Sequence, residues 1–168
     1  IVPIGRWVLR EGCRQASLLR RQLADRPALS MSINLSVKQL QHSDIVADVR
    51  DALADSGLDP ACLTLEITET VMMTDTDLAV QRLKELKDLG VRLAIDDFGT
   101  GYSSFGMLRD LSVDRLKIDA AFVRGIVHSD RQQHLVRAIV ALAKGLAIET
   151  VAEGVETEDS WITMANLG

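Results

Sequence analysis

The sequence predicts an α/β fold in which helices cover a parallel sheet. Short apolar runs alternate with amphipathic stretches five times along the chain, and this alternation is typical of parallel sheets, whose strands are joined by helical crossovers. The 168 residues are 47% hydrophobic, which is enough for one sizeable core. No low-complexity linker divides them, so residues 1–168 are expected to form a single domain.

The first expected element is a helix over residues 5–23. Its apolar side chains are spaced for one buried stripe, and the pattern ends before Pro27. A strand is expected wherever a short apolar run follows a turn signal. The five expected strands cover residues 29–35, 63–67, 91–95, 114–118 and 148–152.

A helix is expected after each of these strands, because apolar residues recur there with helical spacing. These helices cover residues 45–54, 78–89, 103–111, 131–143 and 158–167. Gly57, Gly90 and Gly145 lie near the ends of three of them, where glycine commonly closes a helix. A complete (β/α)8 barrel of the TIM type needs about 250 residues. Five strand-helix units and an N-terminal helix are therefore either an incomplete barrel or a complete open sheet.

Composition and charge narrow the class of protein. The net charge of −5 argues against binding to polymeric nucleic acid. Cys13 and Cys62 are far apart and predict neither a disulfide framework nor a zinc site. No apolar run approaches the roughly 18 residues of a membrane span, and no signal peptide is recognisable. We expect a cytoplasmic domain, and whether its parent protein is membrane-anchored stays open. Because the chain begins at Ile1 without Met and stops after a helix, we also expect truncation at both ends.

Polar residues recur where each expected strand ends. They are Asn34, Glu66, Asp96, Asp97, Lys117, Asp119 and Glu153. In parallel α/β folds the carboxyl ends of the strands build one rim, so these side chains should converge. Carboxylate and amide oxygens suit Mg²⁺ or Mn²⁺, and no histidine lies at a strand end to favour zinc. Four acids in one cleft would repel one another unless a cation were bound or their pKa values were raised.

Two adjacent acids, Asp96 and Asp97, follow the third expected strand. Two divalent ions about 3.5–4 Å apart are a common device for phosphodiester hydrolysis, and adjacent acids could lie astride such a pair. Neighbouring residues of a regular strand point to opposite faces, so the strand must end or twist here. The following residues 98–101, FGTG, favour such an end. The structural alternative is that acids at strand ends cap the next helix, and that Lys117 is an ordinary surface lysine.

Six segments in sequence order resemble those of a known family. They are PIGRWVL at 3–9, SINLS at 32–36, LEITE at 65–69, DDFGTGYSS at 96–104, KID at 117–119 and AEGVET at 152–157. Together they resemble the EAL domain over essentially the whole chain. The resemblance implies a TIM-type barrel that hydrolyses cyclic di-GMP to linear pGpG in bacterial second-messenger signalling. It also implies two Mg²⁺ or Mn²⁺ ions, with Ca²⁺ inhibitory.

The resemblance assigns roles to individual residues of this chain. The metal ligands would be Asn34, Glu66, Asp96 and Asp97. Lys117 would hold or polarise the attacking water, and Glu153 would serve the water and the metal site. Three further residues would support them: Asp119 beside Lys117, Glu69 steadying the loop after Asp97, and Glu156 near the substrate. The same loop would contribute to a homodimer, and a GGDEF or sensor domain is expected elsewhere in the parent protein.

Two departures from the family pattern leave alternatives open. No Glu-Ala-Leu segment occurs in the 168 residues, although its glutamate is a metal ligand in this family; it is expected before Ile1. The later glutamine-glycine segment is also missing. A catalytically inactive EAL-like receptor, which binds cyclic di-GMP without turnover, is therefore the main alternative. An enolase-like barrel would also place acids and a lysine at strand ends, but the contiguous DDFGTGYSS and AEGVET segments favour the EAL domain.

Overall fold

The computed structural model describes residues 1–23, 29–41, 44–69, 76–99, 108 and 111–168. Five parallel strands form one sheet, and their spatial order is their order in the chain. They are β1 Met31–Asn34, β2 Leu63–Thr68, β3 Arg92–Phe98, β4 Arg115–Ile118 and β5 Glu149–Ala152. The prediction of an α/β fold with five parallel strands is confirmed. In a (β/α) barrel each right-handed crossover places the next strand on the same side of the previous one, and these strands follow that order. Within the described residues, β1 and β5 are the two edges of the sheet.

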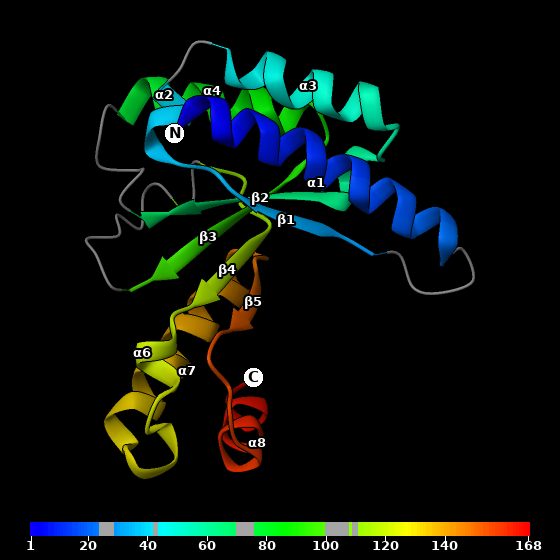
Figure 1. The fold of residues 1–168 in the computed structure, drawn as a ribbon. Helices are drawn as coiled ribbons and strands as arrows, with labels where there is room; N and C mark the ends of the chain where they lie inside the picture. Colours follow the sequence, from blue (N-terminus) through cyan, green and yellow to red (C-terminus); the bar gives the residue numbers. More distant parts are fainter. Residues whose placement is uncertain (24–28, 42–43, 70–75, 100–107, 109–110) are drawn as a thin grey trace.

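The helices largely occupy the expected ranges. They are α1 Val2–Gln22, α2 Val37–Gln41, α3 Ile45–Ser56, α4 Thr76–Asp88, α6 Ala120–Val123, α7 Asp130–Gly145 and α8 Glu158–Leu167. Two 3-10 turns, η1 Pro60–Cys62 and η3 Ile126–His128, complete the described elements. The helix expected over 103–111 falls almost entirely on residues outside the described ranges. Figure 1 shows α1 to α4 gathered over β1, β2 and β3, with α6 to α8 beside β4 and β5.

Local chemistry explains where several helices begin and end. Gly57 closes α3 with a left-handed φ of 63°. Ser129 and Thr157 cap α7 and α8 by accepting hydrogen bonds from the amides of Gln132 and Ser160. The short helix α2 was not predicted, because five residues carry too little periodicity.

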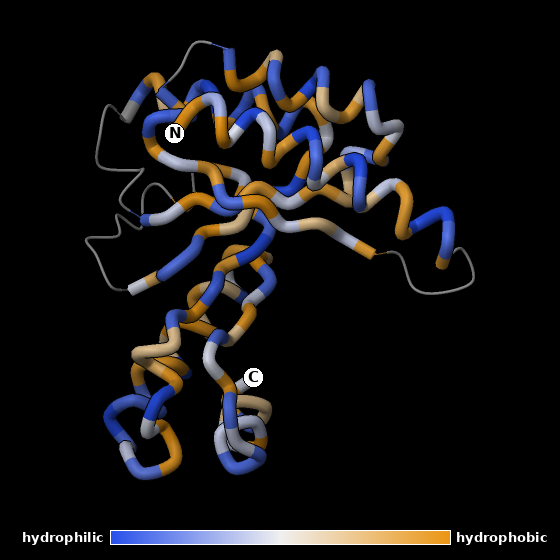
Figure 2. Tube along the Cα trace, viewed as in Figure 1, coloured by the Kyte–Doolittle hydropathy of each residue, from blue (hydrophilic) through white to orange (hydrophobic). Residues whose placement is uncertain are grey.

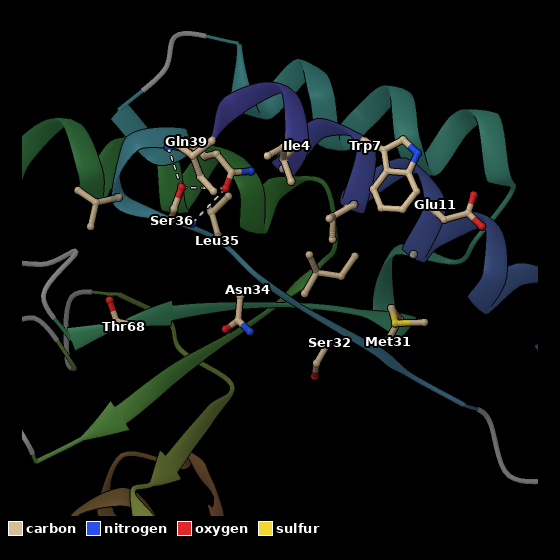
Figure 3. Close-up of a pocket in the computed structure, with 16 residues that line it drawn as sticks. Ile4, Trp7, Glu11, Met31, Ser32, Asn34, Leu35, Ser36, Gln39 and Thr68 are labelled. Carbon is tan, nitrogen blue, oxygen red and sulfur yellow. Dashed lines mark hydrogen bonds between the residues drawn. The ribbon is translucent and has the colours of Figure 1, made fainter.

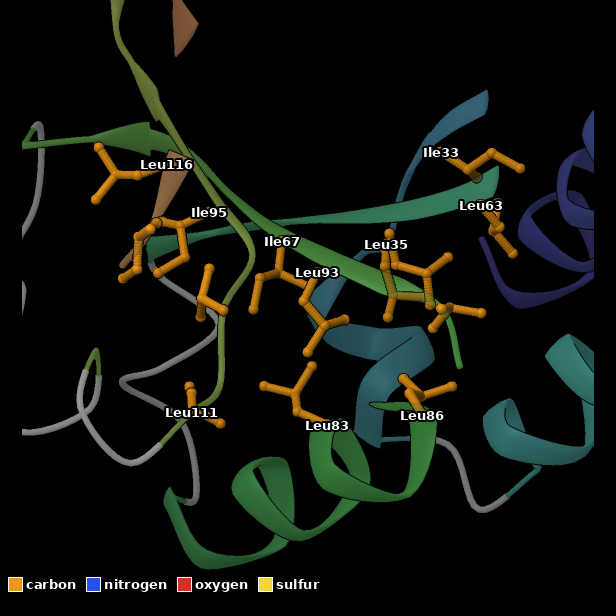
Figure 4. Close-up of a cluster of buried hydrophobic side chains, with 14 of the residues drawn as sticks. Ile33, Leu35, Leu63, Ile67, Leu83, Leu86, Leu93, Ile95, Leu111 and Leu116 are labelled. Atoms are coloured by element: carbon orange, nitrogen blue, oxygen red, sulfur yellow. The ribbon is translucent and has the colours of Figure 1, made fainter. Parts of the chain in front are cut away.

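One part of the hydrophobic core lies between β2, β3 and α4. Leu65, Ile67 and Leu93 are fully or almost fully buried, and Figure 4 shows Ile67 and Leu93 facing Leu83 and Leu86 of α4. Strands buried on both faces are expected in a parallel sheet. Along the helices, hydrophilic and hydrophobic residues alternate (Figure 2), which is the pattern of helices with one face toward a sheet. This core holds the carboxyl ends of β2 and β3 in place.

Two further observations bear on the earlier expectations. Cys13 and Cys62 are both buried free thiols, and burial raises the pKa of the Cys13 thiol to about 11. Of the helices in the described ranges, none combines the length and apolar character that crossing a membrane would require.

Candidate active site

The parallel register aligns the carboxyl ends of the strands. Asn34 at the end of β1 is paired with Glu66 of β2, and Thr68 at the end of β2 is paired with Asp96 of β3. On the other side Ile118 of β4 pairs with Ala152, so that Glu153 follows directly beyond β5. Side chains from all five strands are thus delivered to one edge of the sheet, as expected for this class of fold.

A distortion of β3 allows the two adjacent aspartates to reach one place. The pairing of β3 with β4 shifts register between Ile95 and Phe98, and Asp97 has a left-handed φ of 54°. A left-handed residue within a register shift is the geometry of a β-bulge, which redirects side chains. One carboxylate oxygen from each of Asp96, Asp97 and Glu153 lies within 4.8 Å of the others. The twist that the sequence required at this point is therefore present.

Lys117 connects acids from three different strands. Its Nζ lies 2.9 Å from Oε2 of Glu66, 2.8 Å from Oδ1 of Asp96 and 2.7 Å from Oε1 of Glu153. The lysine side chain is only 13% exposed, so it is not an ordinary surface lysine. Burial by itself would lower the pKa of Lys117, but the hydrogen bonds to Asp96, Glu153 and Glu66 outweigh burial and raise it. Lys117 is therefore a fixed cation at neutral pH and not a proton acceptor.

Asp97 is the acid whose surroundings oppose ionisation. Its pKa is raised by burial, then by the charge of Asp96, and by a hydrogen bond and charge from Asp119. A divalent cation among these oxygens would offset that repulsion. The donor set consists of hard oxygens, and among the described residues no histidine or cysteine belongs to it. The cluster therefore fits Mg²⁺ or Mn²⁺ better than zinc.

Two of the supporting residues lie where they touch the turn after β3. Glu69 is 3% exposed, and its Oε2 accepts a hydrogen bond from the amide of Gly99 at 3.2 Å. Asp119 caps α6 by accepting from the amide of Ala121 at 2.7 Å, and it also contacts Asp97. The expected support of Lys117 by Asp119 is not visible as a direct contact, because Asp119 follows the end of β4 and turns toward Asp97.

The two remaining expected site residues, Asn34 and Glu156, are both exposed. Asn34 is exposed beside Glu66 and lines a groove of about 760 Å³ between α1 and β1, with Trp7 and Ile4 on the helix side (Figure 3). This groove is largely apolar and does not contain the carboxylates around Lys117. Glu156 is exposed in the segment that joins β5 to α8. The structure thus gathers Glu66, Asp96, Asp97, Lys117 and Glu153, and Asn34 lies beside Glu66 in the strand register.

Three small residues near the cluster, Gly99, Ala120 and Gly154, were given no role in the site from the sequence. Gly99 and Gly154 have φ values of 95° and 67°, and both pack closely on α6, where Gly154 meets Ala120. The available signal was that Gly99 follows Phe98 at the end of β3 and Gly154 follows Glu153 just beyond β5, positions where backbone turns need φ > 0.

Comparisons with known proteins agree with this geometry. A family model described as the EAL domain matches residues 1–168. The bifunctional diguanylate cyclase/cyclic di-GMP phosphodiesterase MucR of Pseudomonas aeruginosa is 44% identical over 169 residues, which is 100% of this chain and 24% of MucR. The cyclic di-GMP phosphodiesterase NbdA of the same organism is 43% identical over 151 residues, or 90% of this chain and 19% of NbdA. The chain thus spans about a quarter or less of these relatives.

Solved structures show the same fold. The phosphodiesterase PaMucR in complex with c-di-GMP superimposes with a TM-score of 0.93 at 42% identity, over 100% of this chain and 67% of that one. The Klebsiella pneumoniae BlrP1 complex with manganese and cy-diGMP has a TM-score of 0.83 at 36% identity, over 97% of this chain and 42% of that one. The five-stranded sheet is therefore part of the barrel found in these structures, and the chain belongs to the EAL domain family.

Proposed function

We propose that this chain is part of a metal-dependent phosphodiesterase that hydrolyses cyclic di-GMP to linear pGpG. The observation that carries the proposal is the contact of one half-buried lysine with acids on β2, on β3 and directly after β5, next to the close cluster of Asp96, Asp97 and Glu153. A cation flanked by acids at the carboxyl rim of a parallel sheet suits attack on a phosphodiester, in which negative charge grows on phosphorus oxygens. MucR and BlrP1, which share this fold, have been crystallised with the dinucleotide.

The metal-binding residues would be Asn34, Glu66, Asp96 and Asp97. Mg²⁺ or Mn²⁺ held there would stabilise the attacking water and the leaving oxygen. Two ions are proposed, because one Mg²⁺ is usually held by one or two carboxylates and this rim offers more than two. BlrP1 has been described with calcium as well as manganese, and we propose that Ca²⁺ inhibits this protein, because its larger and more flexible coordination shell would misplace the reacting groups.

Lys117 and Glu153 have complementary roles in this proposal. The charge of Lys117 would stabilise negative charge on the scissile phosphate and orient the attacking water, since it remains protonated at neutral pH. Glu153 is the most exposed of the three acids that contact Lys117, at 31% against 11% and 14%. It is therefore the partner best able to reach the water and accept its proton. Glu69 would hold the turn after Asp97, Asp119 would support the site beside α6, and Glu156 would lie near the substrate.

The surroundings of the domain follow from the same proposal. MucR carries both cyclase and phosphodiesterase activities by name, and we propose that a GGDEF or sensor domain accompanies this chain in its parent protein. A cytoplasmic location would give the domain access to cyclic di-GMP. A homodimer is proposed through the loop after Asp97, whose residues 100–107 lie outside the described ranges.

The test is hydrolysis of cyclic di-GMP by the full-length protein in Mg²⁺ or Mn²⁺, with products separated by chromatography. Glu153→Gln and Lys117→Ala should each lower kcat by about 10²- to 10⁴-fold. Arg115→Met is the matched control, because it removes a cation from the opposite end of the same strand; it should retain wild-type turnover.

The second candidate function is a receptor that binds cyclic di-GMP without hydrolysing it. The contacts of Lys117 with Glu66, Asp96 and Glu153 favour the phosphodiesterase. A receptor that does not hydrolyse the dinucleotide would not need both Lys117 and Glu153. Tight binding of intact dinucleotide, with no pGpG in either metal, would establish the receptor and contradict the proposal.

A further inference from the structure

The single turn α6 lies between the two strand ends that carry the acid cluster. It begins three residues after Lys117, and its cap Asp119 accepts a hydrogen bond from the amide of Ala121 at 2.7 Å. The same Asp119 contacts Asp97. The turn is therefore tied to β4 through the chain and to the end of β3 through a side chain.

A second tie to β3 runs through the ring of Phe122. A Cβ built on Gly99 would lie 2.8 Å from Cε2 and Cζ of that ring, closer than real Cβ contacts come. The ring thus rests directly on the Gly99 backbone, while Glu69 accepts a hydrogen bond from the Gly99 amide at 3.2 Å. Phe122 is half-buried and packs against the hydrophobic core, which anchors the ring. Gly99 is held by an apolar contact and a polar one.

A third tie runs from α6 to the end of β5. A Cβ on Gly154 would lie 2.6 Å from Cβ of Ala120 and 3.4 Å from its Cα. Gly154 directly follows Glu153 and has a φ of 67°. The methyl group of Ala120 therefore occupies the place where the Cβ of a larger residue at 154 would lie, and the backbone beyond Glu153 packs directly against it.

We propose that α6 is a positioning element for the acid cluster, in which Phe122 orients Asp97 through the Gly99 turn and Ala120 orients Glu153 through Gly154. The physical reason is that Asp97, a non-glycine residue, holds a left-handed φ of 54° next to the Gly99 turn. Such backbone conformations persist only where the surroundings determine them. Loss of the Phe122 ring would let the 97–99 turn relax and spread the oxygens that now lie within 4.8 Å. The inference rests on the proposed function, since it treats this cluster as the metal site.

The test measures Mn²⁺ binding by calorimetry in the full-length protein, together with thermal unfolding of the metal-free form. Phe122→Ala should weaken Mn²⁺ binding by about 10- to 100-fold, the usual effect of losing a residue that orients metal ligands. Phe122→Met is the conservative variant, because its flexible side chain can still reach Gly99, and it should restore most of the affinity. Ile139→Ala on α7 is the stability control, since it removes buried apolar atoms outside α6.

The outcomes separate the inference from the proposed function. Lower thermal stability in both Phe122→Ala and Ile139→Ala, with weaker Mn²⁺ binding in Phe122→Ala alone, would support positioning by the ring. Wild-type Mn²⁺ affinity in folded Phe122→Ala would overturn the inference and leave the phosphodiesterase proposal standing. A wild-type protein that binds no Mn²⁺ would overturn both.

Discussion

Replacing Lys117 by methionine tests the electrostatics of the site most directly. The change keeps an unbranched side chain and removes the charge that now contacts Glu66, Asp96 and Glu153. Without it, four acids including Asp97 share one rim. In metal-free solution we therefore expect the folded state of Lys117→Met to be less stable than that of the wild type.

The magnitude follows from the burial of the partners. Breaking a buried ion pair costs about 3–5 kcal/mol, and each lost hydrogen bond to a charged group about 1.5–3 kcal/mol. These values do not add, because the three acids share one cation, and Glu153 is partly solvated at 31% exposure. A loss of about 3 kcal/mol in the free energy of unfolding is expected, which lowers the Tm of a domain of this size by roughly 6–12 °C.

The assay is urea unfolding followed by circular dichroism, in EDTA and again in excess Mn²⁺. Mn²⁺ should stabilise Lys117→Met more than it stabilises the wild type, because a bound cation offsets the unpaired acids. Arg115→Met is the control: Arg115 pairs with Glu149, whose side chain is 62% exposed, and such pairs contribute at most about 1 kcal/mol. Equal stability of Lys117→Met and wild type in EDTA would refute the claim that the lysine offsets a repulsive cluster.

Three further outcomes are expected. The pKa of Asp97 is raised in the folded state, first by burial, so the stability contributed by its protonated form is present at low pH and is lost as the pH rises above 3.8. Asp97→Asn should therefore be more stable than wild type in EDTA at neutral pH, with no such gain below pH 3.8. Unfolding curves of the two proteins that show no pH-dependent difference would contradict this prediction. Gly154→Ala should lower the free energy of unfolding in urea by about 1–3 kcal/mol, because of the left-handed φ and the clash with Ala120. Adding Ala120→Gly should recover part of this loss. If the free-energy changes of the two substitutions simply add in the double variant, the two residues are not in contact. Leu86 of α4 is 0% exposed, so Leu86→Ala should lower the free energy of unfolding by about 2–5 kcal/mol, measured by thermal unfolding. A loss below about 1 kcal/mol would mean that the packing of α4 on the sheet contributes little to the stability of the core.

The sequence predicted most of the fold because its elements are locally marked. β2 and β3 appear as short, strongly apolar runs between turn residues, and the structure places them at the buried centre of the sheet. α3 ends at Gly57 as expected. The elements that were missed, α2 and α6, are five and four residues long, too short for a helical period to be recognised.

The meeting of the candidate site's acids at one rim could be expected from the sequence for a topological reason. Every strand of a parallel sheet ends on the same rim, so residues such as Glu66, Asp96 and Glu153 could be expected to meet without knowledge of their distances. Their catalytic and metal-binding roles stay predictions. What the strand ends could not indicate was that Asn34 also lines the largely apolar groove beside α1.

By itself, the sequence determined the order of strands and helices, the acidic rim and the family, because each depends on local spacing or on contiguous segments. Only the tertiary structure decided that Asp97 turns left-handed, that Lys117 contacts acids from three strands, and that α6 packs on Gly99 and Gly154. These features depend on the register between strands and on the close fit of backbone to side chain. Both the register and the close packing depend on residues that are far apart in the chain, so they could not be predicted from local sequence patterns.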